Sequence, residues 1–277
     1  MSRKLTQIPE IPNYDYIRNE MNRDLAYRLE SRKERTFLGR PLYYRINIQV
    51  ITTQECPFNC PFCLERQNPM EGHNDFPAQI ESLKRILKEH PLAKMTITGG
   101  EPGLYPEHVQ NLIQIYAENS NQIGCSINTT GYSTELNDIA RHSGFARIKL
   151  SCNDYVQGDP SLFPNCMLQT VVETPTLEFV KDFMADHEAK YFKFRFLSGL
   201  EKKDYDIQIW NELRTSSDFN VKLFRIGDFF VNASFTYEDK FGQVALGDMW
   251  QQKHNNYEDG YSNIIIHPDG RIGVNWS

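Results

Sequence analysis

The chain has 277 residues, of which 40% are hydrophobic and 24% are charged, and its formal net charge is -6. A chain of this size and composition folds around one substantial core, with room for an appended subdomain, and is not a disordered segment. No apolar run reaches the roughly 18 residues of a membrane helix and no apolar signal segment opens the chain, so we expect a cytoplasmic protein that does not bind a membrane. Because Lys and Arg are scattered along the chain, we do not expect it to bind nucleic acid.

The hydrophobic pattern alternates between strand and helix periods along most of the chain. Charged residues at helical spacing first predict an amphipathic leader helix over residues 14–35. The strands that follow are expected at residues 45–52, 94–100, 124–130, 146–152, 167–173 and 190–197, with helices at 78–90, 106–119, 133–142 and 176–187. Because a parallel connection needs a crossover, usually a helix, this order predicts an α/β fold, a partial (β/α)6 TIM-like barrel.

The regular alternation ends after Gly199. A helix is expected over 203–216 and strands within 221–235 and 262–277, where Asp269-Gly270 is a hairpin signal. We therefore expect an N-terminal helical leader over 1–44, a partial barrel over 45–200 and a small C-terminal extension over 201–277 that packs on the barrel.

Three of the six cysteines fall within the stretch CPFNCPFC, residues 56–63, directly after the first predicted barrel strand. Three thiolates on one short loop are suited to a metal centre. A structural zinc site needs four ligands and commonly uses two spaced pairs; no second pair is present, although His73 could supply a fourth ligand. The residues therefore favour iron–sulfur over zinc. The other cysteines are expected to be reduced, buried packing residues, namely Cys125, Cys152 and Cys166.

The cysteine spacing C-x3-C-x2-C after the first strand resembles the cluster loop of the radical S-adenosylmethionine (radical SAM) superfamily. Cys56, Cys60 and Cys63 match it position by position, and Phe62 matches the aromatic residue that commonly precedes the third cysteine. The resemblance implies that the three cysteines hold a [4Fe-4S] cluster and leave one iron open. The methionine part of S-adenosylmethionine would chelate that iron.

A second motif, TITGGEPGLYP over residues 96–106, ends the second barrel strand. Two glycines there permit close backbone approach or a positive φ, and on its own the stretch also fits a plain strand-to-helix turn. Together with the cluster loop it resembles the superfamily motif that holds the methionine ammonium group. The resemblance assigns that role to Gly99, Gly100 and Glu101.

Further polar residues resemble the molybdopterin-cyclase-like branch of the superfamily. SINTTGY, residues 126–132, predicts Asn128 and Thr129 as cofactor-pocket residues, with Thr130 where that branch often has Asn. IKLSCNDY, residues 148–155, points to Ser151 as a cofactor contact and to Asn153 as a substrate contact. The alternative is that such polar groups cap helices and turns, and for Asn153 the two readings are equally supported.

The expectation about substrate charge rests on two cationic side chains in predicted strands. Lys149 shares a strand face with Ser151, and Arg195 lies between Phe194 and Phe196 in KFRFLSGL, residues 193–200. A cation that faces a barrel interior needs an anion, which can be a phosphate or carboxylate of the substrate. The alternative is that one or both point outward and pair with surface acids.

The resemblance covers about residues 45–200 and implies an enzyme. Reduction of the cluster by a protein such as flavodoxin or ferredoxin would cleave S-adenosylmethionine and yield a 5'-deoxyadenosyl radical that abstracts hydrogen. The substrate expected is a small polar metabolite, changed by rearrangement, epimerisation, elimination or dehydrogenation. Modification of a peptide or protein is the alternative, and a non-catalytic iron–sulfur or zinc protein is a third reading. No cysteine follows Cys166, so an auxiliary cluster with cysteine ligands is not expected.

Overall fold

The computed structural model describes residues 36–37, 40–41, 47–67, 69, 73–121, 124–172, 176–196, 205–227, 230–247 and 263–273. These residues belong to two compact units, each discontinuous in the chain. One unit, the cluster-loop unit, comprises residues 42–166 and 255–277. The other, the C-terminal-sheet unit, comprises residues 1–41 and 167–254. Among the described residues, no helix has the length and apolar content that crossing a bilayer requires.

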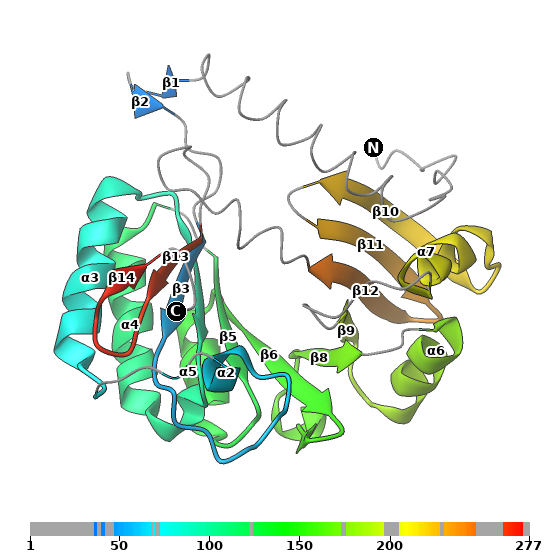
Figure 1. The fold of residues 1–277 in the computed structure, drawn as a ribbon, viewed down its shortest axis with the longest axis horizontal. Helices are drawn as coiled ribbons and strands as arrows, with labels where there is room; N and C mark the ends of the chain where they lie inside the picture. The colour runs from blue at the N-terminus through cyan, green and yellow to red at the C-terminus, as the bar shows by residue number, and fades with distance from the viewer. Residues whose placement is uncertain are drawn as a thin grey trace. The chain divides into compact units, whose positions relative to one another are not determined.

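The cluster-loop unit is built on a largely parallel sheet (Figure 1). Parallel pairs join β3 to β4, β4 to β5 and β5 to β6 along the chain, as expected when helices connect successive strands. Near the C-terminus, β13 pairs in parallel with β3, so the last part of the chain lies beside the first strand of this sheet. The strands are β3 (Asn47–Ile51), β4 (Lys94–Thr98), β5 (Cys125–Thr129), β6 (Ala146–Asn153), β7 (Val156–Gln157), β13 (Asn263–Ile266) and β14 (Ile272–Gly273).

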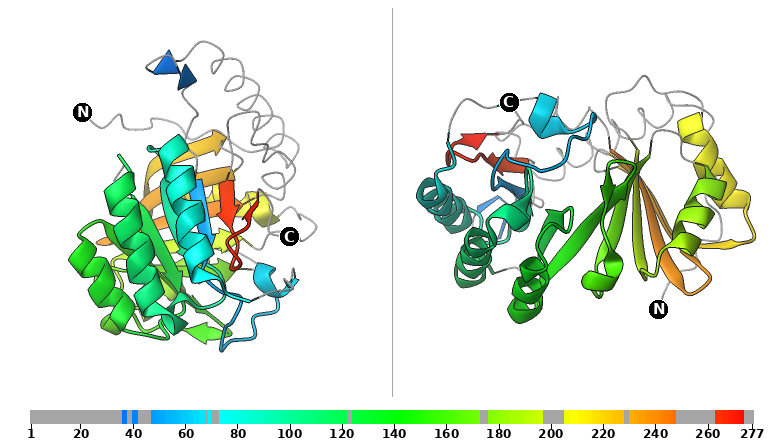
Figure 2. Two further views of the ribbon diagram at one scale, coloured as in Figure 1. Left: turned by 90° about the vertical axis from the view of Figure 1, so that its left-hand side faces the viewer. Right: turned by 90° about the horizontal axis from the view of Figure 1, so that it is seen from below.

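Helices cover one face of this sheet (Figures 1 and 2). They are α3 (Phe76–Glu89), α4 (Pro106–Asn119) and α5 (Glu135–Ser143). The short helix α2 (Leu64–Gln67) follows the loop after β3, and the unit also has 3-10 helices η1 (Pro102–Leu104) and η2 (Pro160–Leu162). Local signals explain the ends of two of them. The Asp75 side chain caps α3 by accepting from the Ala78 N–H at 3.0 Å, and Gly144 ends α5 in the left-handed region at φ 73°. Apolar residues at helical intervals, such as Leu83, Leu87 and Leu112, are fully buried against the strands.

A buried glutamine attaches the C-terminal segment to this core. Gln79, in α3, has no exposed surface; its Nε2 donates to the carbonyls of Ile51 at 2.9 Å and of His267 at 3.0 Å. Its Oε1 lies 2.7 Å from Nε2 of His108 in α4, whose ring stacks on Phe76. One side chain thus joins β3, α3, α4 and the turn after β13, because buried backbone carbonyls require donors.

In the C-terminal-sheet unit the strands follow one another in the order β10-β11-β12-β9-β8. Its strands are β1 (Thr36–Phe37), β2 (Arg40–Pro41), β8 (Met167–Val172), β9 (Tyr191–Phe196), β10 (Phe219–Gly227), β11 (Phe230–Tyr237) and β12 (Lys240–Gly247), with β1 and β2 paired apart from the others. Strands β8 and β9 are parallel, β12 adds in parallel to β9, and β10 and β11 continue the sheet antiparallel.

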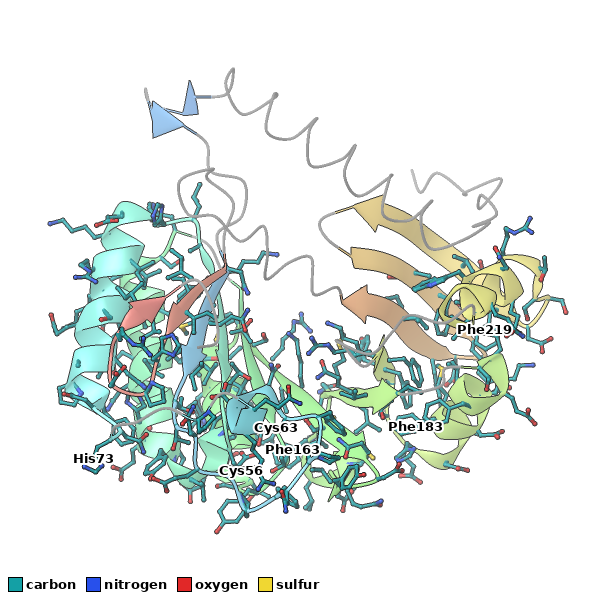
Figure 3. All side chains as sticks on the ribbon, in the orientation of Figure 1. Cys56, Cys63, His73, Phe163, Phe183 and Phe219 are labelled. Carbon is teal, nitrogen blue, oxygen red and sulfur yellow. The ribbon has the colours of Figure 1, made fainter. Side chains whose placement is uncertain are left out.

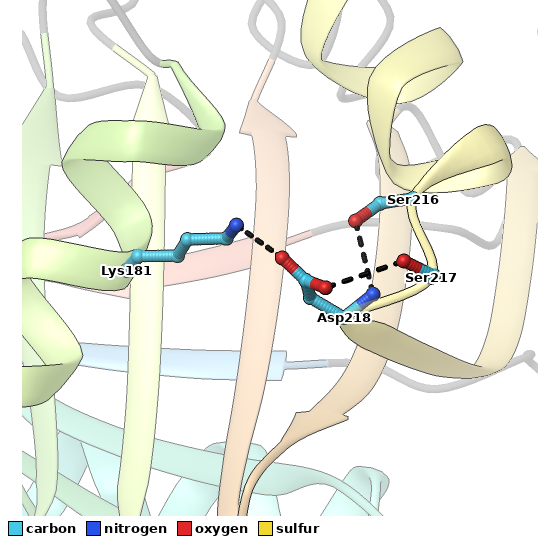
Figure 4. A network of polar contacts seen from close by, with 4 residues as sticks. All are labelled: Lys181, Ser216, Ser217 and Asp218. Atoms are coloured by element: carbon cyan, nitrogen blue, oxygen red, sulfur yellow. Dashed lines mark hydrogen bonds and ion pairs between the residues drawn. The ribbon is translucent and has the colours of Figure 1, made fainter.

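Helices α6 (Leu177–Asp186) and α7 (Tyr205–Thr215) belong to this second unit. Phe179 and Phe183 of α6 meet Phe194 of β9 edge to face, with ring centroids 6.3 and 5.6 Å apart. The Lys181 ammonium of α6 is paired with the carboxylate of Asp218, which follows α7, and Ser216 and Ser217 bond to Asp218 in turn (Figure 4). These contacts hold the two helices beside the sheet.

The structure confirms the predicted α/β fold with parallel strands, and the expected strands and helices from 45 to 197 are present within a few residues. The helix near 203–216, the strands within 221–235 and the Asp269-Gly270 turn are also present. Strand β12 was not predicted. The predicted leader helix over 14–35 lies outside the described residues. The division at residues 44 and 200 stays a prediction.

Candidate functional site

The three clustered cysteines lie on the loop that follows β3. Cys56, Cys60 and Cys63 are each half-buried, and Figure 3 shows Cys56 and Cys63 on this loop. The loop closes locally, because the N–H of Cys63 donates to the carbonyl of Cys60 at 3.2 Å and α2 begins immediately afterwards. His73 lies apart from both labelled cysteines in Figure 3. The cysteines are therefore accessible enough to take up a metal and restrained enough to hold it.

The environment of the thiols opposes their ionisation. Burial raises the pKa of Cys56 and Cys60, and the charges of the neighbouring cysteines, Cys63 among them, raise both further. A thiolate is the form that ligates a metal, so metal binding here must release protons. Burial also raises the pKa of Cys125 to about 12 and of Cys166 to about 11. With Cys152 these thiols are buried, as predicted for packing residues.

The two predicted glycines fit tightly against the start of the cluster loop. Gly100 donates its N–H to the carbonyl of Thr53 at 2.6 Å, and the next N–H, of Glu101, donates to the carbonyl of Glu55 at 2.8 Å. A Cβ on Gly100 would lie 2.1 Å from the Glu55 oxygen, and Gly99 has φ 124°. Glycine is needed here because two backbones touch. The loop after β4 therefore packs directly on the residues that lead into Cys56.

Glu101 is fully buried and its carboxylate is bonded to the chain itself. Oε1 accepts from Thr129 Oγ1 at 2.6 Å and from the Gly103 N–H at 2.7 Å. Oε2 accepts from the Thr130 N–H at 2.7 Å and from Thr130 Oγ1 at 2.5 Å. A carboxylate has about four acceptor positions, so these four donors satisfy it. Glu101 thus joins the loop after β4 to the end of β5.

One face of the sheet in the cluster-loop unit is polar and half-buried. Along β4, β5 and β6, the residues Ile97, Ile127 and Leu150 are fully buried, while the alternate positions are half-buried. These alternate positions are polar and hydrogen-bonded to one another. Lys149 Nζ donates to Ser126 Oγ at 2.9 Å, and Ser126 Oγ lies 3.2 Å from Thr96 Oγ1. The helices cover the apolar face, so these polar groups lie on the sheet face opposite the helices.

The predicted residues Asn128, Lys149 and Ser151 lie together on this polar face. Lys149 and Ser151 alternate with buried residues along β6, and Asn128 of β5 pairs with Lys149. Asn128 Nδ2 lies 3.4 Å from Thr98 Oγ1. Among the described residues, its Oδ1 is buried and has no hydrogen-bond partner. A buried acceptor without a donor is costly, so this amide is suited to a ligand.

Two other predicted residues have local partners. Asn153 Oδ1 accepts from the Tyr155 N–H at 2.9 Å, which forms the turn between β6 and β7. The turn-capping interpretation of Asn153 is the one that this contact supports. Phe62 packs edge to face with Tyr155, at 5.8 Å between ring centroids.

Arg195 belongs to the other unit, on β9. It is exposed and alternates with the buried Phe192 and Phe194, which pack against α6. Arg195 therefore lies on the sheet face opposite α6, and not against the helix. In the outward-facing alternative, Arg195 would lie on the side of the sheet that the helix covers. Its position on the opposite side favours the interpretation in which Arg195 lies on a polar face of the sheet.

Comparison with known proteins identifies the part of the chain that carries these motifs. Residues 50–157 match the Radical SAM superfamily. This region is similar to radical SAM domains. It contains Cys56, Cys60 and Cys63, the Gly99–Glu101 loop and the polar face, and it ends at β7.

Curated relatives extend the similarity over most of the chain at low identity. The GTP 3',8-cyclase of Tolumonas auensis is 23% identical over 255 residues, which are 86% of this chain and 71% of that protein. A probable GTP 3',8-cyclase of Pyrococcus abyssi is 28% identical over 115 residues, 41% of this chain and 35% of that one. These relatives belong to the cyclase-like branch that the motifs of residues 50–157 resemble.

Solved structures share the fold. SuiB of Streptococcus suis, bound to S-adenosylmethionine, superposes with a TM-score of 0.52 at 15% identity and covers 96% of this chain and 66% of that one. SuiB bound to its precursor peptide SuiA gives 0.54 at 13% identity, with 96% and 65% covered. The chain thus spans about two thirds of the length of this structure and shares its fold.

Radical SAM enzymes bind a [4Fe-4S] cluster and S-adenosylmethionine, and the donor set of this region fits the cluster. Within the described ranges, no three His, Cys, Asp or Glu side chains converge where one metal ion could sit. Each cysteine of a four-iron cluster ligates a different iron. Three half-buried thiols on one loop are therefore suited to the cluster, and Asn128 Oδ1 is an acceptor suited to the second ligand.

Sequence reasoning missed several residues around the radical SAM site. Thr130 was left without a role, yet it supplies two of the four donors to Glu101. Glu65, in α2, is buried with Gln54 Nε2 3.3 Å from its Oε2, and burial raises the pKa of Glu65 to about 7. A cavity of about 250 Å³ lies nearby and is lined by Thr53, Gln54, Glu55, His73, Asn74, Pro268 and Asp269. No local pattern signals these contacts, because the partners are far apart in sequence.

Proposed function

We propose that the protein cleaves S-adenosylmethionine reductively and abstracts hydrogen from a small polar metabolite that carries an anionic group. The observation that carries the proposal is the packing of the Gly99–Glu101 loop on the residues that lead into Cys56, beside the half-buried polar face of β4, β5 and β6. When bound, the cluster and S-adenosylmethionine supply a 5'-deoxyadenosyl radical once one electron arrives. We propose flavodoxin or ferredoxin as the donor, in the cytoplasm.

The chain's own residues bind the cluster and orient the groups that contact the cofactor. Cys56, Cys60 and Cys63 hold the cluster, and Glu101 positions the end of β5 through Thr129 and Thr130. With the ends of β4, β5 and β6 aligned, Asn128 and Ser151 present polar groups toward the cofactor from one face. Preorganised groups of this kind lower the cost of bringing reacting atoms together.

Lys149 is the residue that supports an anionic substrate. Its ammonium lies on the polar face, where it donates to Ser126 Oγ. In a half-buried site a cation attracts a phosphate or carboxylate more strongly than it would in bulk water. The curated relatives are named as cyclases of GTP, which is an anionic nucleotide. GTP is therefore the first substrate to test.

The deciding experiment follows a deuterium label. Anaerobically reconstituted protein is reduced and given GTP with a deuterated ribose, other labelled nucleotides or a labelled peptide, and 5'-deoxyadenosine is analysed by mass spectrometry. Label transfer from an anionic metabolite supports the proposal, whereas transfer from the peptide alone would establish the alternative. Lys149→Met should raise KM at least about tenfold while sparing cleavage of S-adenosylmethionine without substrate. Lys94→Met, an exposed lysine at the start of β4, is the matched control.

A further inference from the structure

The turn between β6 and β7 carries a tyrosine that reaches the cluster loop. Tyr155 is 49% exposed, and its ring meets the ring of Phe62 at a centroid distance of 5.8 Å and an interplanar angle of 73°. The two residues are far apart in sequence, and the edge-to-face geometry is a favourable arrangement for two aromatic rings. The contact therefore links the cluster loop to the end of β6.

The backbone that carries Tyr155 is held firmly. Its N–H donates to Asn153 Oδ1 at 2.9 Å, and Asn153 pairs with the buried Val156 across the turn. Beyond the turn, a Cβ on Gly158 would lie 2.4 Å from the carbonyl oxygen of Ser151, so the returning strand touches β6 directly. A ring mounted on such a turn is a fixed support and not a mobile side chain on a loose loop.

Tyr155 contacts the cluster loop at Phe62. Phe62 lies between Cys60 and Cys63, whose backbones are bonded to each other at 3.2 Å. A restraint on Phe62 therefore limits how far the segment between these two cysteines can open. Loss of iron from a cluster requires such opening, because a thiolate must leave its iron before a competing ligand can replace it.

We infer that Tyr155 is a positioning residue for the cluster loop, acting through the ring of Phe62. The inference rests on the proposed function in one respect, that Cys60 and Cys63 hold the cluster. An aromatic pair contributes stabilising free energy beyond that of its buried area. Removing one ring should therefore speed opening of the loop about three- to tenfold. Tyr155 touches no reacting atom in this scheme, and its hydroxyl is not required.

The test measures how fast iron leaves the reconstituted protein. Wild type, Tyr155→Phe, Tyr155→Leu, Phe62→Leu and the double variant are mixed anaerobically with an excess of an iron chelator, and the visible absorption of the cluster is followed. Tyr155→Leu should lose iron about three- to tenfold faster, and Tyr155→Phe should match the wild type. The double variant should lose iron no faster than Phe62→Leu, because Tyr155 acts through that ring.

Other outcomes separate the possibilities. Tyr132→Leu, at a 57% exposed tyrosine of the same unit, serves as a control and should behave as wild type. Iron loss from Tyr155→Leu at the wild-type rate, or an equal acceleration in both backgrounds, would overturn the inference. A parallel fall in the thermal unfolding midpoint would show a general structural role and would also overturn it. If wild type holds the cluster but never cleaves S-adenosylmethionine, the proposed function fails while the iron-loss rates still decide the role of Tyr155.

Discussion

The carboxylate of Glu101 and the hydroxyl of Thr130 are 2.5 Å apart, and the Thr130 N–H reaches the same oxygen at 2.7 Å. The two residues follow neighbouring strands, β4 and β5, whose side chains Thr96 and Ser126 also meet. Since the carboxylate has no exposed surface, its bonds are not weakened by water. The contact fixes the strand ends on which the proposed cofactor residues lie.

Replacing Glu101 should therefore cost stability as well as cofactor affinity. Glu101→Ala leaves buried donors of Gly103, Thr129 and Thr130 without an acceptor, and we expect a loss of about 3 kcal/mol in the free energy of unfolding. Chemical denaturation measures it. The control is Glu107→Ala, at an exposed position in α4, which should change little. Equal stability of the two variants would show that the Glu101 bonds contribute nothing.

Gly100→Ala should block assembly of the cluster loop. The added Cβ would lie 2.1 Å from the Glu55 oxygen, so the loop after β4 and the entry to Cys56 must move apart. We expect iron and sulfide content after reconstitution to fall well below the wild-type value. Gly144→Ala is the comparison: it has φ 73° but no atom within 4 Å of the new Cβ, so it should keep full iron content. Normal iron content in Gly100→Ala would refute the close packing.

The two groups of cysteines should behave differently. Ala at Cys56, Cys60 or Cys63 should abolish the cluster, and Ala at the buried Cys152 or Cys166 should leave it intact. Anaerobic reconstitution of wild type should give about four irons and four sulfides per chain. Iron and sulfide analysis with visible absorption checks this. One tightly bound zinc without iron–sulfur absorption would reverse the assignment.

Acid should destabilise the protein through His108. Burial lowers the pKa of His108 from 6.5 to about 4, so between these values the unfolded chain binds a proton that the folded chain does not. The free energy of unfolding therefore contains the full contribution of neutral His108 above the higher of these two pKa values. That contribution falls as the pH drops toward 4, by roughly 2 kcal/mol at about pH 5. His108→Gln should lose less stability than wild type between about pH 7.5 and about pH 5 in denaturant unfolding. Identical losses in both proteins would exclude His108 as the cause.

Two lysines of the C-terminal-sheet unit should differ in importance. Lys240 Nζ bonds to the carbonyls of Met184 and His187 at the end of α6, where a cation satisfies terminal carbonyls and the helix dipole. Lys240→Met should cost about 1 kcal/mol of unfolding free energy. Lys181→Met removes an exposed pair with Asp218 and should change stability little. A larger loss for Lys181→Met than for Lys240→Met would contradict this ranking.

Much of the fold and part of the candidate site could be predicted from sequence. The helix α3 followed from apolar residues at helical spacing, and the turn at Gly270 from its Asp-Gly signal. The cluster cysteines were recognisable because their spacing is itself the signal. The partners of Glu101 were not predictable, since Thr130 is 29 residues away and lies on another strand.

By itself, the sequence determined the local elements, the cluster-loop motif and the polar alternation that places Lys149 and Ser151 on one face, because these depend on residues near one another in the chain. Tertiary structure alone decided that β13 pairs with β3, that β12 adds to β9, that Thr130 satisfies Glu101 and that Tyr155 meets Phe62. Such contacts join distant segments, and which partners meet is settled by the packing of the whole core and by the need of every buried polar group for a partner.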